Sequence, residues 1–186
     1  MTEPELGSTL LVIARSAIAD GLGLPGGREA SHPALARPGA TFVTLKRNGE
    51  LRGCIGSLEP ARPLAVDVRE NAVAAAFRDP RFAPLGAAEF RSTSVEVSLL
   101  SSSESIEFAS EEELLANLRP GIDGLILQCG RRRATFLPQV WEVLAEPRQF
   151  VAALKEKAGL PEGFWSREVN VSRYVVTKWA ETDFAF

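Results

Sequence analysis

A cysteine and an arginine stand two positions apart in the hexapeptide Leu51-Arg52-Gly53-Cys54-Ile55-Gly56. If this segment is a β-strand, the alternation of side chains places Arg52, Cys54 and Gly56 on one face. A guanidinium close to a thiol favours the thiolate, which is the nucleophilic form. Two glycines around the thiol indicate a bulge, or close approach by a ligand or another backbone. The hexapeptide is therefore the first candidate for a functional site.

Cys54 also fits a purely structural role. Cysteine is commonly a small buried apolar residue, and reactivity requires exposure as well as a nearby cation. With Lys46 opposite Leu51 in a hairpin, Val43 would lie opposite Cys54 and Leu45 opposite Arg52, which gives the thiol aliphatic neighbours. A packed, inert cysteine and a reactive one are both open, and the exposure of the sulfur distinguishes them.

The elements on both sides of the hexapeptide are a hairpin and a helix. The segment 41–46 is rich in β-branched and aromatic residues, and Asn48-Gly49 is a strong hairpin signal. Pro63 suits the first turn of a helix that we expect from about Pro63 to Arg78. Backbone N–H groups of the turn at 56–60, between the strand and this helix, could receive an anion.

Other elements follow from their own patterns. Ser8 is a candidate cap for an N-terminal helix that ends at Gly21, and a loop is expected from Leu24 to Gly39. Ser110 and Glu113 form a predicted capping box. The other expected elements are strands at 93–99, 124–129, 134–137 and 169–178, and helices at 111–117, 138–144 and from Pro147. Tight hairpins and an irregular alternation of helices and strands predict an α+β fold with a mostly antiparallel sheet and packed helices.

Composition narrows the classes of function. The chain has 186 residues with 45% hydrophobic and 24% charged side chains, enough for one domain or two small lobes. A net charge of -3 argues against nucleic acid as a partner, and the basic cluster 131–133 is interpreted as a solvated turn. The sequence has neither a long apolar run nor a secretory signal pattern, so we expect a cytoplasmic protein without membrane contact.

Metal and disulfide chemistry are not expected. The chain contains two cysteines, Cys54 and Cys129, and one histidine, His32. In a reducing compartment both cysteines should be free thiols, with Cys129 structural. A single histidine in a loop argues against a histidine-rich metal site, and no cofactor is predicted.

These residues resemble the AMMECR domain family, whose bacterial members are often labelled AmmeMemoRadiSam system protein A. The hexapeptide 51–56 is the hallmark of that family and is intact here. The resemblance extends in order from about residue 40 to the C-terminus. Its other segments are 41–45, 76–82, 95–98, 121–125, 135–141 and 157–161.

The resemblance implies a single domain over residues 1–186, with an N-terminal helix and loop at 1–39 and the family core at 40–186. It implies two unequal lobes of two-layer α/β type, a cleft near the hexapeptide and a bacterial, cytoplasmic protein. It also implies partnership with a Memo-like protein and a radical S-adenosylmethionine enzyme. It brings no established reaction, and the oligomeric state stays open.

Three functions remain in competition. In the first, which we favour, the chain is an accessory or binding module whose hexapeptide lines a cleft for a partner or a small anionic ligand. Its glycines permit close approach, and Arg52 supplies a planar fork for a carboxylate or phosphate. The candidate binding residues are Arg52, Gly53, Gly56, Arg78, Asp79 and Arg81, although internal ion pairs of a packed loop would also explain the last three.

In the second function the chain is an enzyme. Cys54 serves as nucleophile or thiol base, Arg52 stabilises an anion, and a carboxylate carries the proton. The candidate carboxylates are Glu59, Glu70, Glu96 and Asp123, of which Glu96 is expected to point away from the buried face of its strand. In the third, the hexapeptide is only a tight junction between strand, turn and helix.

Overall fold

The computed structural model describes residues 3–25 and 30–184 of the chain. It separates into two compact units: unit 1 comprises Met1–Leu100 and Thr177–Phe186, and unit 2 comprises Ser101–Val176. Each unit combines helices with a sheet of four strands. The predicted α+β class is confirmed.

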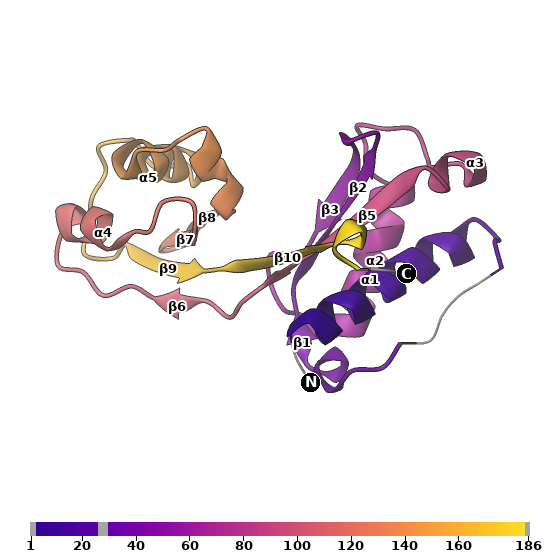
Figure 1. Ribbon diagram of the computed structural model, residues 1–186. Coiled ribbons are helices and arrows are strands. Elements are labelled where there is room, and N and C mark those ends of the chain that lie inside the picture. The colour runs from indigo at the N-terminus through magenta and orange to yellow at the C-terminus, as the bar shows by residue number, and fades with distance from the viewer. Residues whose placement is uncertain (1–2, 26–29, 185–186) are drawn as a thin grey trace. The chain divides into compact units, whose positions relative to one another are not determined.

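Unit 1 is built on a sheet with the strand order β10-β5-β2-β3. The strands are β2 (Thr41–Arg47), β3 (Glu50–Gly56), β5 (Thr93–Leu100) and β10 (Val176–Ala180). The helices α1 (Glu3–Gly21) and α2 (Leu64–Phe77) pack on one face of this sheet (Figure 1). The predicted hairpin and the helix that follows it are therefore both present.

The two faces of this sheet differ in chemistry because its strands alternate apolar and polar side chains. Val43 and Leu45 of β2 and Val95 and Val97 of β5 are fully buried in one core with α1 and α2. The opposite face carries polar side chains from all four strands. We call it the polar face; it comprises Thr44, Lys46, Cys54, Glu96 and Lys178.

Short elements complete unit 1. The turn η1 (Pro33–Ala36) precedes β1 (Pro38–Gly39), which pairs with β4 (Arg62–Pro63) just before α2. Helix α3 (Ala87–Phe90) precedes β5, and η3 (Glu181–Asp183) follows β10. Residues 26–29 of the predicted loop at 24–39 lie outside the described residues.

Unit 2 has a second sheet with the order β6-β9-β7-β8. Its strands are β6 (Glu104–Ser105), β7 (Gly124–Cys129), β8 (Arg132–Phe136) and β9 (Asn170–Tyr174); its helical elements are α4 (Glu111–Asn117), η2 (Pro138–Glu142) and α5 (Pro147–Lys157). The core of unit 2 is centred on Phe150, whose ring stacks on Trp141 with 3.8 Å between centroids. The predicted cap of α4 is confirmed, because Ser110 accepts a hydrogen bond from the Glu113 backbone N–H.

Two predicted boundaries were wrong. Ser8 is not a cap: it lies inside α1, where its hydroxyl donates to the Glu5 carbonyl, and the helix already includes Glu3. The predicted strand at 169–178 is interrupted at Val175 and divides into β9 and β10, which belong to different sheets. Alternation alone does not reveal such a division, since both halves keep their alternating pattern.

Among the described helices, none has the length and apolar character needed to cross a bilayer.

Candidate functional site

Strand β3 pairs with β2 in a register that differs from the prediction. Cys54 lies opposite Thr44 and Gly53 opposite Leu45, and the pairing then shifts by one residue so that Arg52 has no partner on β2. Such a bulge bends a strand and redirects a side chain. The predicted pairs Val43 with Cys54 and Leu45 with Arg52 were wrong because they assumed a regular ladder.

The guanidinium of Arg52 contacts helix α3 and the loop that precedes it. It forms a two-pronged ion pair with Glu89, with 2.6 Å from Nε to Oε1 and 3.0 Å from Nη2 to Oε2, and donates from Nη2 to the Ala83 carbonyl at 2.8 Å. This hydrogen bond from Arg52 lowers the pKa of Glu89 below its ordinary value. The guanidinium expected beside the thiol thus holds β3 to Glu89 of α3 and to Ala83 in the loop before that helix.

A different arginine lies at Cys54. Arg81 donates to Asp79 through Nε (2.9 Å) and Nη2 (2.7 Å), and Nη2 also reaches the Cys54 carbonyl at 3.2 Å. Asp79 in turn accepts the backbone N–H of Cys54 at 2.8 Å. The hydrogen bond from Arg81 is the main reason why the pKa of the buried Asp79 falls far below its usual 3.8. Asp79 is therefore an ionised anchor for the backbone of Cys54.

The thiol of Cys54 is half-buried and contacts one hydroxyl. Thr44 Oγ1 lies 3.3 Å from Cys54 Sγ, directly across the strand pair. A threonine hydroxyl does not act as a base at neutral pH, so this contact orients the sulfur without activating it. The arrangement resembles neither of the two extremes expected from the sequence, a fully packed thiol or one facing Arg52.

Both glycines beside Cys54 are required by packing. A Cβ at Gly53 would lie 2.2 Å from the backbone carbonyl oxygen of Ala75 in α2, and a Cβ at Gly56 would lie 2.2 Å from the Phe42 ring. These distances are far below van der Waals contact. The two glycines therefore let β3 approach α2 on one face and the Phe42 ring on the other.

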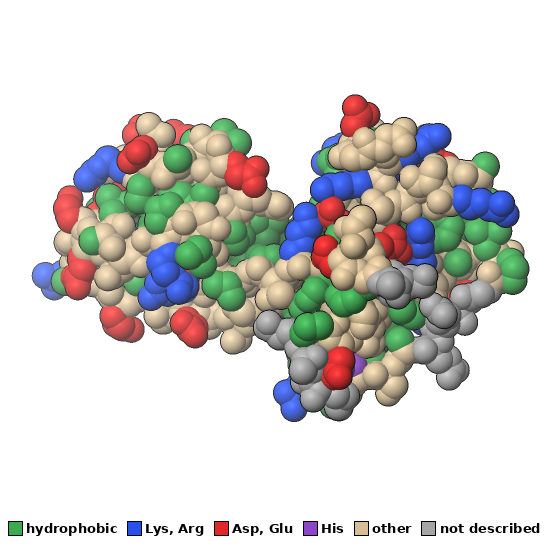
Figure 2. Space-filling view, viewed as in Figure 1, with side chains coloured by type: hydrophobic (Ala, Val, Ile, Leu, Met, Phe, Trp, Pro, Cys, Tyr) green, Lys and Arg blue, Asp and Glu red, His purple; other side chains and the backbone are tan. Residues whose placement is uncertain are grey.

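Glu96 lies on the polar face in strand β5, separated from Cys54 by strand β2. Its carboxylate is held between Lys46 at 2.8 Å and Lys178 at 2.5 Å. Burial acts to raise its pKa, but the hydrogen bonds from Lys178 and Lys46 together outweigh burial and lower it. Figure 2 shows basic and acidic side chains interspersed on the visible side of unit 1.

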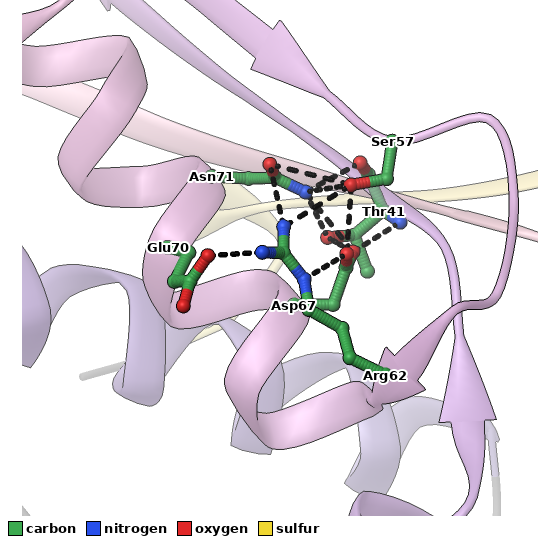
Figure 3. Close-up of polar contacts among 6 residues, drawn as sticks. All are labelled: Thr41, Ser57, Arg62, Asp67, Glu70 and Asn71. Atoms are coloured by element: carbon green, nitrogen blue, oxygen red, sulfur yellow. Dashed lines mark hydrogen bonds and ion pairs between the residues drawn. The ribbon is translucent and has the colours of Figure 1, made fainter.

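A buried polar network that the sequence analysis missed fixes the segment after the hexapeptide (Figure 3). Asp67 of α2 is fully buried, and its Oδ2 accepts both the backbone N–H and the hydroxyl of Thr41 at 2.7 Å. Its Oδ1 accepts from Ser57 at 2.7 Å and from Arg62 Nε at 2.9 Å. Asn71 joins the network by donating to Asp67 at 3.0 Å. Because Asp67 and Asn71 lie one helical turn apart beside the apolar stripe of α2, the sequence did carry a signal.

The remaining predicted carboxylates are engaged elsewhere. Glu59 is exposed in the loop after β3, and the exposed Glu70 pairs with Arg62. Asp123 lies in unit 2, where it is fully buried and pairs with Arg119 at 2.6 Å. Of the other predicted site residues, Arg78 is exposed at the end of α2. The structure therefore gathers Arg52, Gly53, Gly56, Asp79 and Arg81 around Cys54, and places Glu96 on the same face as the thiol.

Several relatives share most of the chain. A protein of Methanothermobacter thermautotrophicus is 39% identical over 177 residues, which cover 90% of each chain. A protein of Thermotoga maritima is 40% identical over 145 residues, 77% of this chain and 78% of the relative. The crystal structure of the uncharacterized protein PH0010 from Pyrococcus horikoshii matches with a TM-score of 0.76 and 34% identity, over 95% of this chain and 92% of that one.

These relatives correct one expectation and confirm another. The chain was expected to be bacterial, but its relatives are mostly archaeal, with Thermotoga maritima as a bacterial example. The family model described as AMMECR1 matches residues 11–179, and therefore extends into the N-terminal helix. With this match and relatives at about 40% identity, the chain belongs to the AMMECR1 family.

Proposed function

We propose that this protein is a binding module in which the polar face of unit 1, centred on Cys54 and Thr44, receives a partner protein. The proposal rests on which residues of the hexapeptide are already engaged in contacts within the protein. Arg52 is paired with Glu89, and Gly53 packs under Ala75, so neither is free to contact a ligand. Cys54 has its side chain on the polar face, beside Thr44.

The surroundings of the thiol support binding rather than proton transfer. A general base must lie within about 2.6–3.2 Å of the proton it takes. The sulfur contacts the Thr44 hydroxyl. The carboxylate of Asp79 already accepts hydrogen bonds from Arg81 and from the backbone N–H of Cys54. A low pKa also makes Asp79 a poor proton acceptor.

The charges on the polar face favour a protein partner over a small anion. Lys46 and Lys178 flank Glu96, which gives alternating signs that a complementary protein surface can match. An anionic ligand is the weaker option, since the guanidiniums of Arg52 and Arg81 already pair with acids.

The family resemblance identifies the partners to test, a Memo-like protein and a radical S-adenosylmethionine enzyme. The two unpaired thiols, Cys54 and Cys129, are compatible with a reducing compartment and support a cytoplasmic location.

Isothermal titration of the purified chain against each purified partner from the same organism tests the proposal. We expect Lys178→Glu, which reverses a charge on the polar face, to weaken binding about tenfold or more. Arg69→Glu is the matched control, because Arg69 is similarly exposed (55% against 52% for Lys178) but lies on α2, where it pairs with Asp20. Equal losses for both variants would disprove the assignment to this face, and no binding by either partner would refute the named partners.

A thiol-dependent enzyme is the second candidate, and one observation favours it. Arg81 Nη2 lies 3.2 Å from the Cys54 carbonyl, which brings a cation close to the thiol. Alkylation with iodoacetamide distinguishes the two functions. It is carried out on the Cys129→Ser variant, in which Cys54 is the remaining thiol. Labelling of folded protein faster than of a free cysteine would favour the enzyme. The binding module instead predicts labelling slower than that of a free cysteine.

A further inference from the structure

Strand β3 ends the sheet of unit 1, and an edge strand presents unpaired backbone groups to any other strand. The N–H and carbonyl of Cys54 point outward at this edge, away from β2. Both groups are occupied by side chains: the N–H donates to Asp79 Oδ2 at 2.8 Å, and the carbonyl accepts from Arg81 Nη2 at 3.2 Å. A carboxylate and a guanidinium thus supply the acceptor and the donor that a neighbouring strand would supply.

The segment that contains Asp79 and Arg81 contacts β3 at a second point. Arg52 donates to the Ala83 carbonyl and pairs with Glu89, so residues 79–89 follow the edge from Cys54 toward the hairpin. The loop is also fixed to α2, where the backbone N–H of Leu85 donates to the Ala76 carbonyl at 2.8 Å. We call residues 79–89 the strap.

We propose that the strap is a guard that prevents strand β3 from pairing with β3 of a second copy of this chain. The self-pairing it prevents is geometrically simple. Two β3 strands placed antiparallel about a two-fold axis at Cys54 would exchange the two hydrogen bonds that Asp79 and Arg81 now make.

Analytical ultracentrifugation of the full chain tests the guard, together with hydrogen exchange of the Cys54 amide at low and high protein concentration. The double variant Asp79→Ala/Arg81→Ala should lower the apparent dimer dissociation constant about tenfold or more relative to the unsubstituted chain. Its Cys54 amide should exchange more slowly as concentration rises. Asp79→Asn keeps an acceptor oxygen for the Cys54 N–H and should stay close to the unsubstituted chain.

Asp20→Ala/Arg69→Ala is the matched control, because it removes an ion pair between α1 and α2 that involves neither β3 nor the strap. Association of this control to the same extent would overturn the proposal. So would a folded Asp79→Ala/Arg81→Ala variant that keeps the unsubstituted mass at every concentration. If the double variant does not fold, Arg81→Ala alone frees the Cys54 carbonyl; added association supports the guard, and its absence in folded protein overturns it.

Discussion

In two strands of the unit 1 sheet, the edge strand β3 and the inner strand β5, a carboxylate binds a backbone N–H, with opposite effects on the pKa of that carboxyl. On β3, Asp79 accepts the backbone N–H of Cys54 and pairs with Arg81. On β5, Glu181 accepts the backbone N–H of Val95 at 2.8 Å. Glu181 also pairs with Arg15 at 2.9 Å. In both cases a carboxylate completes the hydrogen bonding of a strand and an arginine neutralises the carboxylate.

The pKa values of the two carboxyls move in opposite directions. Two hydrogen bonds from Arg81 dominate at Asp79 and lower its pKa. At Glu181 burial has the largest effect and raises the pKa. Arg15 offsets burial only in part, because it contacts Glu181 through Nε while the Nη1 of Arg15 donates to the Thr93 carbonyl at 2.9 Å. Asp79, the carboxylate cap on the backbone of Cys54, is therefore charged at neutral pH, whereas Glu181, the carboxylate cap on β5, takes up a proton more easily than a free glutamate.

The first prediction concerns packing on the two edge strands, β3 and β10, and has the largest expected effect. Gly53→Ala places a Cβ against the Ala75 carbonyl oxygen, a backbone atom that cannot move alone, and should cost about 3 kcal/mol of unfolding free energy. Gly7→Ala places a Cβ against the Trp179 ring of β10, but alanine also favours the helix, so the net cost should be about 1 kcal/mol. Urea unfolding of both variants measures the difference, and equal costs would contradict it.

The second prediction compares the carboxylates at neutral pH. Asp79→Asn removes a charged acceptor that Arg81 binds twice and should cost about 2 kcal/mol, a value discounted because Arg81 is half-exposed. Glu181→Gln should cost less than about 0.5 kcal/mol, since burial already disfavours the charged form. Thermal and urea unfolding give both values. A larger loss of unfolding free energy for Glu181→Gln than for Asp79→Asn would contradict this prediction.

The third prediction is a pH dependence with opposite signs. The pKa of Asp79 is lowered, so its contribution to stability is present above 3.8 and is lost as the pH falls below that value toward its folded pKa. The pKa of Glu181 is raised, so its contribution is present below 4.5 and is lost as the pH rises through its folded pKa. Unfolding free energies from about pH 3 to pH 7, for the unsubstituted chain and each amide variant, show both trends. Parallel trends would refute the comparison.

The sequence predicted the elements around the site well because their signals are local. Asn48-Gly49 identified the hairpin, and Pro63 identified the start of α2 within one residue. The strand pattern at 93–99 placed Glu96 on the face away from the core, as observed.

The contacts of the site could not be predicted because they join distant segments. The bulge that redirects Arg52 leaves no local signature beyond the glycines, and the residue that pairs with Arg52 lies 37 positions later. Asp79 was singled out as part of a packed loop, but its bond to the Cys54 backbone depends on how that loop crosses the edge of β3. The division of the last predicted strand between two sheets is likewise a property of the fold rather than of the local pattern.

The carboxylate that binds the backbone N–H of Cys54 has a lowered pKa, whereas the carboxylate that binds the backbone N–H of Val95 on β5 has a raised pKa. Carboxyl carbon NMR titration of the folded protein measures both groups directly. The account predicts that Asp79 titrates below 3.8 and Glu181 above 4.5. Titration of Asp79 at or above its ordinary value, or of Glu181 at or below its own, would contradict it.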